Sequence, residues 1–566
     1  MRRSLSLLVL TSVLVISFSL APLAPQTFAQ SATARNAKAT AVSLASQRGV
    51  DTISAAQLKD YLSFIASDEM EGRDTPSRGL DTTAKFLALN LSRWGFKPAG
   101  DDGSFLQKIA LSRDFVDKAE THVQLNDQQL SFGTDYIPYA RPADLPATKL
   151  VFAGNGWFVK SKEIDAYKGL DAKGKIAVIF TAPNGLPQGI KTADLSGKRG
   201  EDWMNAGEYA LKQGVVALLF VPDFQYLANW DRNRTRLTER GTTKVEKFQP
   251  TAGAQMPQLV LSPHTAEALF QDERQSAQTI IESIYSGKTP QPFPLSANKQ
   301  LSITVKVKSD HATTQNVVAV FEGSDPVLKN EYVALGAHYD HVGVGVPVNG
   351  DAIYNGADDD GSGTTALLSM AEALAKARTR PKRSVLFVWH AGEEKGLWGS
   401  RYFTNFPTLP LASIVTQINI DMIGRSRKAG DTNPRNQNLS GPNEIYVIGS
   451  KMMSTDLGGL VESVNKQYQN LTYDYRYDDP SDPNRFFFRS DHYNYARKGI
   501  PIVFFFDGEH EDYHRPGDSV DKIDFQKMET VARTIYLTLW EVANRPARPT
   551  VDKQLPVLLQ RDRELP

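Results

Sequence analysis

The sequence predicts an α/β fold: a mostly parallel central sheet with helices on both faces, together with an inserted smaller domain that is rich in β-strands. Two observations lead to this prediction. Beyond residue 300, continuous apolar runs of strand length alternate with helical segments, as in sheets that are buried on both faces. Between residues 126 and 292 the apolar runs become shorter and are separated by turn residues, which indicates a second hydrophobic core.

The elements of the larger domain are predicted from the spacing of its apolar residues. Helices are expected at 362–378 and 524–544, and two more between 58 and 94, where apolar residues recur at helical spacing. The expected strands are 317–321, 332–337, 384–389, 414–420 and 500–506.

The insert is predicted in the same way. One amphipathic helix is expected at 203–213, and the Arg-, Asn- and Thr-rich segment 229–243 is expected to be an exposed loop. The insert has no cluster of His and carboxylate residues, so no chemistry is assigned to it. Its expected strands are 150–153, 175–181 and 215–221.

Composition narrows the functional classes. The 566 residues, of which 41% are apolar, are enough for two or more cores. The 64 Lys and Arg residues balance 64 Asp and Glu, so no net field attracts a polyanion, which argues against nucleic acid or a membrane surface as a partner. The absence of cysteine excludes disulfides, thiolate zinc sites and a cysteine nucleophile. Any metal site must therefore use His, Asp and Glu.

The N-terminus has the layout of a secretory signal peptide. Two arginines precede an apolar stretch from Leu7 to Ala21, and small residues lead to an expected cleavage after Ala29. The apolar stretch is shorter than the ~20 residues of a spanning helix and is followed by Pro22. No later segment is long and apolar enough to cross a bilayer. We therefore expect a secreted or periplasmic protein with no membrane anchor after processing.

Side chains suited to metal binding follow the predicted strands of the larger domain, and in such sheets ligands bind beyond the carboxyl ends of the strands. Taken singly, each has an ordinary structural interpretation, such as a helix N-cap or surface charge. Together at one edge of one sheet, they favour a metal site. They are His338, Asp340, Glu393, Glu394, Asp421 and His514, with Asp358, Asp359 and Asp360 in a Gly-rich loop before a predicted helix.

These residue types suit a zinc site that activates water. Imidazole nitrogens and carboxylate oxygens bind Zn²⁺, and two ions about 3.5 to 4 Å apart need a bridging carboxylate. Asp340, two residues after His338, can accept the second N–H of that imidazole and fix its orientation. Of the adjacent Glu393 and Glu394, one can bind metal while its neighbour faces the substrate as a general base.

Five strings resemble the di-zinc aminopeptidases of peptidase clan MH, a group that includes bacterial secreted leucyl aminopeptidases and glutamate carboxypeptidase. The segment 62–72 looks like the N-terminal part of the same domain, and the insert resembles a protease-associated domain at 167–175 and 214–220. The five strings are Gly336–His341, Asn355–Gly363, Ala391–Leu397, Asn419–Met422 and Tyr513–His514.

The resemblance implies two Zn²⁺ ions and their ligands. His338 and Asp421 would hold one ion, and Glu394 and His514 would hold the other. Asp358 would bridge the two ions.

The resemblance also implies the catalytic residues, Glu393 and Asp340. Glu393 would be the general base, and Asp340 would orient His338. Asp359 would sit beside the bridging residue and help to receive the substrate amine.

The resemblance extends to nearly the whole mature chain and implies its division. The signal peptide would be followed by a flexible leader, a catalytic domain in two parts separated by the insert, and a tail. The predicted limits are 1–29 for the signal peptide, 30–50 for the leader, 51–125 and 293–545 for the catalytic domain, 126–292 for the insert and 546–566 for the tail.

The expected activity is hydrolysis of N-terminal residues from peptides, with a carboxypeptidase or dipeptidase on the same site as the first alternative and a glutaminyl-cyclase-like transferase as the second. Arg485, Arg489 and Arg515 either bind a substrate carboxylate or are structural. The aromatic cluster within 486–495 either lines a specificity pocket or packs in the core. The sequence indicates a peptide as substrate and makes no prediction of oligomeric state.

Overall fold

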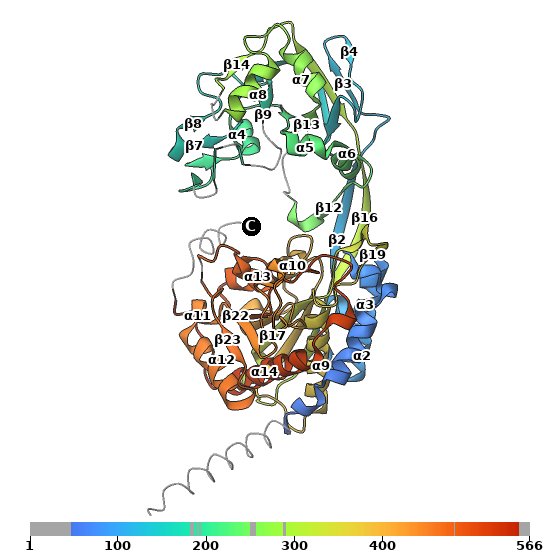
Figure 1. Cartoon of the computed structure of the whole chain (residues 1–566), viewed down its shortest axis with the longest axis vertical. Helices are drawn as coiled ribbons and strands as arrows, with labels where there is room; N and C mark the ends of the chain where they lie inside the picture. The colour runs from blue at the N-terminus through green and yellow to red at the C-terminus, as the bar shows by residue number, and fades with distance from the viewer. Residues whose placement is uncertain are drawn as a thin grey trace, which may run out of the picture.

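The protein has two lobes, shown in Figure 1, with the insert above and the rest of the chain below. The computed structural model describes residues 47–180, 186–187, 189–191, 194–249, 256–286, 290–479 and 481–553. The predicted signal peptide, nearly all of the predicted leader and the end of the predicted tail lie outside these residues. Within the described ranges, no helix has the length and apolar character needed to cross a membrane.

The lower lobe is built on a ten-stranded sheet in the order β12-β2-β16-β20-β17-β21-β24-β22-β23, with β1 paired to β16. The central pairs β20–β17, β17–β21 and β21–β24 are parallel, whereas β16–β20 and β22–β24 are antiparallel. This confirms the predicted α/β fold, although the sheet is mixed rather than mostly parallel, because β2, β12 and β16 add antiparallel pairs on one side. The strands are β1 (Lys97–Pro98), β2 (Leu106–Val116), β12 (Thr242–Val245), β16 (Val307–Phe321), β17 (Tyr332–His338), β20 (Ser384–His390), β21 (Ile414–Ile420), β22 (Glu444–Ile448), β23 (Thr472–Asp474) and β24 (Ile502–Phe506).

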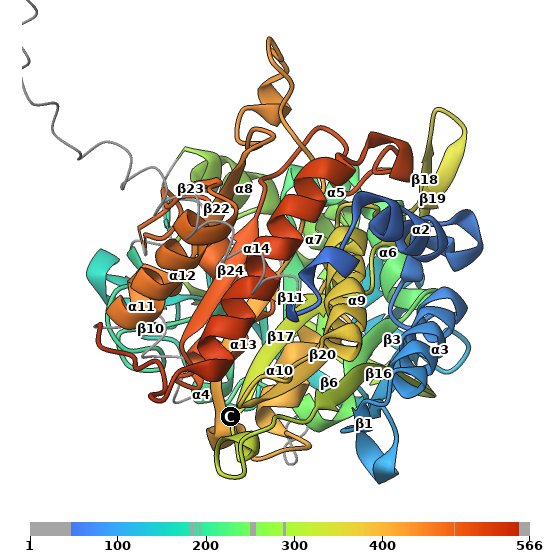
Figure 2. The ribbon, with the colours of Figure 1, turned by 90° about the horizontal axis from the view of Figure 1, so that it is seen from below.

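Helices cover both faces of this sheet (Figure 2). One face packs against α2 (Ala55–Ile65), α3 (Arg78–Arg93), α9 (Gly361–Lys376), α12 (Thr455–Tyr468) and α14 (Phe525–Asn544). The other face packs against α10 (Trp398–Asn405), α11 (Ser450–Met453) and α13 (His492–Arg497). The predicted helices 362–378 and 524–544 are thus confirmed as α9 and α14.

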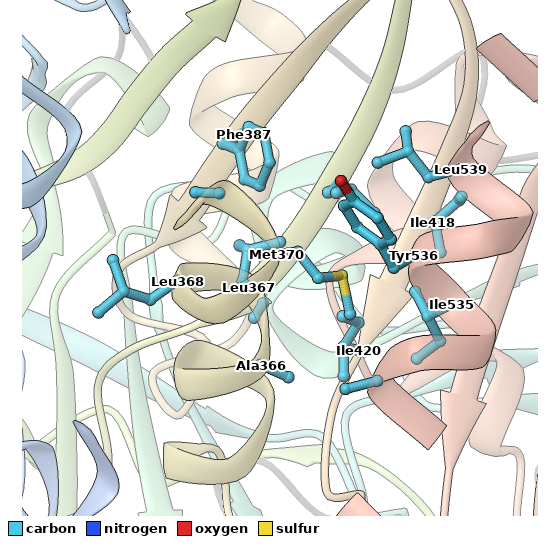
Figure 3. Close-up of a cluster of buried hydrophobic side chains, with 14 of the residues drawn as sticks. Ala366, Leu367, Leu368, Met370, Phe387, Ile418, Ile420, Ile535, Tyr536 and Leu539 are labelled. Atoms are coloured by element: carbon cyan, nitrogen blue, oxygen red, sulfur yellow. The ribbon is translucent and has the colours of Figure 1, made fainter. Parts of the chain in front are cut away.

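Continuous apolar strands and helices explain why this core excludes water. Figure 3 shows Leu367 and Met370 of α9 beside Phe387 and Ile420 of the strands, with Tyr536 of α14 completing the cluster. All five side chains are fully buried. Burial of this kind is the main stabilising contribution to a domain, and it fixes the strand ends that carry the polar residues.

The insert contains a nine-stranded sheet in the order β4-β3-β15-β6-β9-β11-β13-β5, with β14 paired to β6. Strands β3 and β15 lie outside 126–292, so this sheet continues beyond both predicted limits of the insert. The strands are β3 (His122–Leu125), β4 (Gln128–Gln129), β5 (Tyr136–Pro138), β6 (Ala143–Phe152), β9 (Ile176–Phe180), β11 (Ala217–Val221), β13 (Gln258–Leu261), β14 (Phe293–Pro294) and β15 (Gln300–Val305).

Smaller elements complete both lobes. In the insert, β7 (Phe158–Val159), β8 (Ile164–Asp165) and β10 (Trp203–Met204) form a three-stranded sheet, and the helices are α4 (Ala206–Lys212), α5 (Phe224–Ala228), α6 (Trp230–Thr238), α7 (Pro263–Phe270) and α8 (Ala277–Tyr285). In the lower lobe, β18 (Gly343–Val348) and β19 (Asp351–Tyr354) form a hairpin.

Two expectations for the insert need correction. The helix predicted at 203–213 begins only at Ala206, because Asn205 and Glu208 form a capping box there. The segment 229–243, expected to be a loop, contains helix α6 and the start of β12. Tertiary contacts override its polar composition: Leu237 is buried, and the Trp230 indole donates to the carbonyl of Gly133 at 2.9 Å.

The lobes are joined by β2 and β16, which run from one into the other (Figure 1). A second contact is made by β12 and the short helix that follows it, where Val245 packs against Tyr402 of α10. The Arg401 guanidinium lies 4.2 Å from the ring centroid of Phe248. The insert therefore rests on the helix that follows the Glu393–Glu394 loop.

Candidate metal centre

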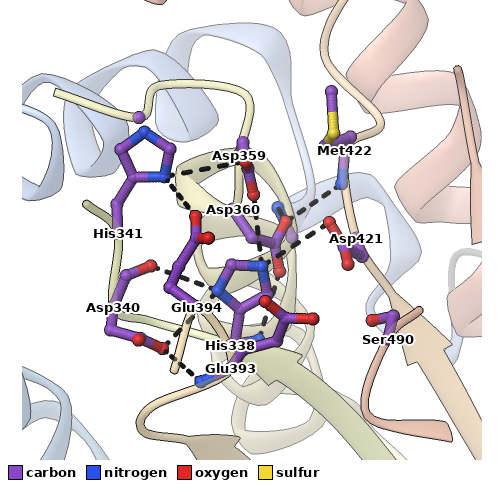
Figure 4. Close-up of polar contacts among 12 residues, drawn as sticks. His338, Asp340, His341, Asp359, Asp360, Glu393, Glu394, Asp421, Met422 and Ser490 are labelled. Atoms are coloured by element: carbon purple, nitrogen blue, oxygen red, sulfur yellow. Dashed lines mark hydrogen bonds and ion pairs between the residues drawn. The ribbon is translucent and has the colours of Figure 1, made fainter. Parts of the chain in front are cut away.

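The predicted polar residues meet where β17, β20 and β21 end, as Figure 4 shows. His338 is the last residue of β17, and Asp421 directly follows β21. The pair Glu393 and Glu394 lies in the loop after β20. Because parallel strands place their carboxyl ends at one edge, residues from three distant segments become neighbours there.

The first of two donor groups contains His338, Asp359 and Asp421. His338 Nε2 lies 3.2 Å from Asp359 Oδ1 and 3.6 Å from Asp421 Oδ1. All three side chains are buried. Their donor atoms are close enough to share one metal ion.

The second donor group is built around Glu394 and the other oxygen of Asp359. His514 Nε2 lies 3.0 Å from Asp359 Oδ2 and 3.1 Å from Glu394 Oε1. His341 Nδ1 lies 2.9 Å from the same glutamate oxygen. The structure therefore brings together the side chains of four of the five predicted ligands, His338, Glu394, Asp421 and His514.

The fifth predicted ligand, Asp358, faces away, and the structure puts Asp359 in the position between the two groups. Asp358 Oδ1 accepts the N–H of Gly424 at 2.7 Å, and its Oδ2 lies 3.3 Å from His510 Nε2. Asp359 is thus central to the site. From the sequence, Asp358 is predicted at this position and Asp359 beside it. Consecutive side chains in a loop point in different directions, and the sequence of three aspartates does not show which one faces inward.

Asp360 has a third orientation and ties the site together. Its Oδ1 accepts the N–H of Met422 at 3.1 Å and of Gly363 at 2.9 Å, which caps α9. Its Oδ2 accepts the N–H of His338 at 3.2 Å. The peptide bond between Asp359 and Asp360 is cis. Asp360 therefore joins the helix start to the strand ends that carry His338 and Asp421.

Asp340 and Glu393 lie next to the first group. The Nδ1 atom of His338 is hydrogen-bonded to the Asp340 carbonyl oxygen at 3.1 Å, and Asp340 Oδ1 lies 3.6 Å away, so the backbone of Asp340 makes the contact predicted for its carboxylate. Asp340 Oδ1 accepts the N–H of Glu393 at 3.1 Å. Burial raises the pKa of Glu393 well above its usual value, and neighbouring Glu394 adds to this.

The second group has the opposite electrostatic character. Burial raises the pKa of Glu394, but the imidazoles of His341 and His514 outweigh it and bring this pKa down to about 2. Burial lowers the pKa of His514, whereas Asp359 and Glu394 raise it to about 10. Adjacent glutamates therefore differ: Glu394 stays ionised while Glu393 holds a proton more readily.

Two supporting residues had no signal in the sequence. The Asp518 carboxylate accepts the N–H groups of Asp358 and Asp359, each at 3.1 Å, and so holds the loop that carries Asp359. Arg73, fully buried, donates to four backbone carbonyls, including those of Tyr339 and Gly356. The predicted N-terminal segment thus packs directly behind the site.

A cleft lies beside Glu393 and Asp421, and its apolar wall consists of Met422, Phe486, Phe504 and Phe506. Arg489 also lines the cleft, and its Nη2 lies 2.6 Å from Glu509 Oε1.

The other residues that the sequence singled out lie elsewhere. Arg485 lies over the ring of Phe488, and Arg515 lines a separate surface cleft. Phe487 and Tyr495 are core residues. The sequence therefore offered one of the lining aromatic residues, Phe486, while the phenylalanines of β24 went unrecognised.

The donor set fits a metal ion. Asp359 Oδ2, Glu394 Oε1 and both ring nitrogens of His341 are buried without a hydrogen bond. Buried polar atoms normally have partners, so converging unpartnered oxygen and nitrogen atoms indicate a shared cation. Carboxylate oxygens with imidazole nitrogens are the ligands of catalytic zinc.

Comparison with known proteins agrees with this chemistry. Residues 316–539 match the model of Peptidase family M28. Leupeptin-inactivating enzyme 1 of Streptomyces exfoliatus is 37% identical over 117 residues, which are 20% of this chain and 24% of that protein. An aminopeptidase of Pseudomonas aeruginosa is 32% identical over 208 residues, 35% of this chain and 36% of that protein. These matches span well under two thirds of either relative.

A solved structure is similar over more of the chain. The aminopeptidase from Aneurinibacillus sp. strain AM-1 aligns with 90% of this chain and 98% of its own, with a TM-score of 0.49 and 16% sequence identity.

Proposed function

Residues 316–539 match peptidase family M28, and on that premise we propose that the chain is a two-zinc aminopeptidase that removes N-terminal residues from peptides. The observation that carries this proposal is the convergence of two donor groups on Asp359, with Glu393 beside them. His338, Asp359 and Asp421 would hold one zinc ion. Asp359, Glu394 and His514 would hold the other.

Glu393 is proposed as the general base. Zinc ions bound by these residues would supply Lewis acidity to the scissile carbonyl and would lower the pKa of the attacking water. Glu393 lines the cleft, and burial raises its pKa, which makes its carboxylate a better proton acceptor for that water. It would then give the proton to the nitrogen of the leaving amine. Asp340 would hold both the His338 ring and the Glu393 backbone in place.

The cleft supports a preference for the amino end of a peptide. Among the described residues that line it, Arg489 is the one basic side chain, and Glu509 already pairs with it. A substrate carboxylate would therefore find no unpaired cationic side chain among these residues, whereas a substrate amine could approach the Glu393 carboxylate. The apolar wall suits an apolar first side chain. The carboxypeptidase alternative has no comparable support.

Metal analysis combined with a substrate panel tests the proposal. We expect about two zinc ions per chain and release of apolar N-terminal residues that stops on chelation and returns with Zn²⁺. C-blocked peptides should be cleaved and N-blocked peptides should not. Cleavage of N-blocked peptides would exclude an obligate aminopeptidase, and activity that survives complete metal removal would exclude zinc catalysis.

We also propose that the chain is exported, on the basis of its signal-like N-terminus, and that the insert is a protease-associated module. N-terminal sequencing of the extracellular or periplasmic protein tests export. The expected mature N-terminus is Gln30, and an intact Met1 on the active enzyme would contradict this proposal.

A further inference from the structure

His341 is a buried imidazole whose position the proposed catalytic chemistry does not yet explain. Its side chain is fully buried, and neither ring nitrogen makes a hydrogen bond. Nδ1 lies 2.9 Å from Glu394 Oε1, yet neither atom has a hydrogen-bond partner. A nitrogen and an oxygen that are close without being hydrogen-bonded are arranged like two ligands directed at a common centre.

The spacing of the surrounding atoms supports a common centre. Tetrahedral zinc ligands at 2.0 to 2.2 Å from the metal lie about 3.3 to 3.6 Å from one another. Around Glu394 Oε1 and Asp359 Oδ2, the distances to His514 Nε2 are 3.1 and 3.0 Å, and those to His341 Nδ1 are 2.9 and 3.7 Å. Both histidines therefore stand at comparable distances from the same two oxygens.

The backbone holds His341 in this position. Its N–H donates to the carbonyl of Arg73 at 3.2 Å. Gly356 lies against the ring at a φ of 56°, and a Cβ atom at this position would lie 2.4 Å from His341 Cγ. The Arg73 side chain also donates to the carbonyl of Gly356 at 2.9 Å. Arg73 therefore contacts both the backbone of His341 and the glycine that packs against its ring. The imidazole is thus fixed before any ligand binds.

We propose that His341 is a fourth protein ligand of the second zinc ion, together with Asp359, Glu394 and His514. This inference rests on the proposed zinc function. Four protein ligands close a tetrahedral site, as in structural zinc sites, whereas three leave a position open for water. The second ion is therefore the more tightly held one, and the ion at His338 and Asp421 keeps the open position.

Zinc titration of the full-length enzyme against a competing chelator tests this assignment. His341→Ala should weaken the tighter of the two zinc-binding steps by more than 100-fold, and His341→Asn should weaken it equally. The Asn amide could donate a hydrogen bond to Glu394 but does not bind zinc well, so this variant separates a ligand from an orienting partner. Loss of an orienting partner typically costs about 10–100-fold in metal affinity.

Matched controls make the result decisive. His311→Ala removes an exposed histidine outside the site and should leave both zinc affinities unchanged. Thermal unfolding of the metal-free variants checks that they fold. Wild-type zinc affinity in His341→Ala, or its recovery in His341→Asn, would overturn the assignment. Because zinc binding is read without substrate, the test stands even if the peptidase activity proves different, and a wild-type chain that binds no zinc would refute both.

Discussion

The two lobes contain similar parallel strands but different strand ends. In the lower lobe β17 ends at His338 and β21 is followed by Asp421. In the insert, β6–β9–β11–β13 is also a parallel series, yet β6 is followed by Ala153, β11 by Pro222 and β13 by Ser262. Among the described residues, the insert has no group of carboxylates and histidines placed to hold a metal ion, whereas the lower lobe has two. A parallel sheet supplies an edge, and the residues placed there decide whether it carries chemistry.

The largest effect expected is from Glu393→Gln in the lower lobe. The turnover number should fall by about 10²–10⁴-fold because a general base is lost, while zinc content stays unchanged. Steady-state kinetics and metal analysis measure both. The exposed insert residue Glu267 provides the control, since Glu267→Gln should leave turnover intact. Undiminished turnover in Glu393→Gln would refute its role.

Arg73→Met should cause the next largest effect, on stability. The side chain donates to four carbonyls behind the site, and its removal leaves them buried without donors. The free energy of unfolding of the lower lobe should fall by about 3 kcal/mol or more. Denaturant titration measures it, with the exposed insert residue Arg274→Met as a control expected within about 0.5 kcal/mol. Equal effects in the two variants would contradict the importance of the carbonyl contacts.

The pH dependence of zinc binding should be smaller but measurable. In the metal-free site the pKa of His514 is raised from 6.5 to about 10, so the protonated imidazole stabilises the fold below pH 6.5 and this contribution is lost as pH rises through 10. Zinc must displace that proton. Its affinity should therefore rise with pH between 6 and 8, by up to about tenfold per unit for each proton released. Chelator competition at several pH values measures this, and a flat profile would contradict it.

The smallest effect is expected in the insert. Asn205→Ala removes the cap of α4, where Asn205 Oδ1 accepts the N–H of Glu208 at 2.9 Å. The insert should lose about 1 kcal/mol of stability with no change in kcat/KM. Thermal unfolding and kinetics measure the two quantities. A large loss of activity would show that the insert contributes directly to catalysis. It would contradict the claim that the chemistry belongs to the lower lobe alone.

Strand ends were predictable from the sequence, because the length of an apolar run fixes where a buried strand stops. That is why His338, Glu394 and Asp421 were predicted to lie at one edge of the sheet, and helices α9 and α14 were predicted from apolar residues at helical spacing. The inserted domain was recognised from a change of pattern, although β3 and β15 extend its sheet beyond the predicted limits.

Contacts between distant segments were not predictable. Asp359 faces the donor groups because Asp518, about 160 residues later, holds the N–H groups of its loop. Arg73 acts on backbone carbonyls, which no sequence pattern marks. His341 lies in the segment Gly336–His341, which resembles the family, but its position in the site follows only from its distance of 2.9 Å to Glu394. Helix α6 forms within a polar segment because Leu237 finds a buried position.

Zinc analysis of Asp359→Asn beside Asp358→Asn tests the central claim most directly. Asp359 belongs to both donor groups, so its replacement should abolish binding of both zinc ions. Asp358→Asn keeps an oxygen to accept the N–H of Gly424 and should retain about two zinc ions per chain. Retention of zinc by Asp359→Asn, together with its loss from Asp358→Asn, would contradict the account.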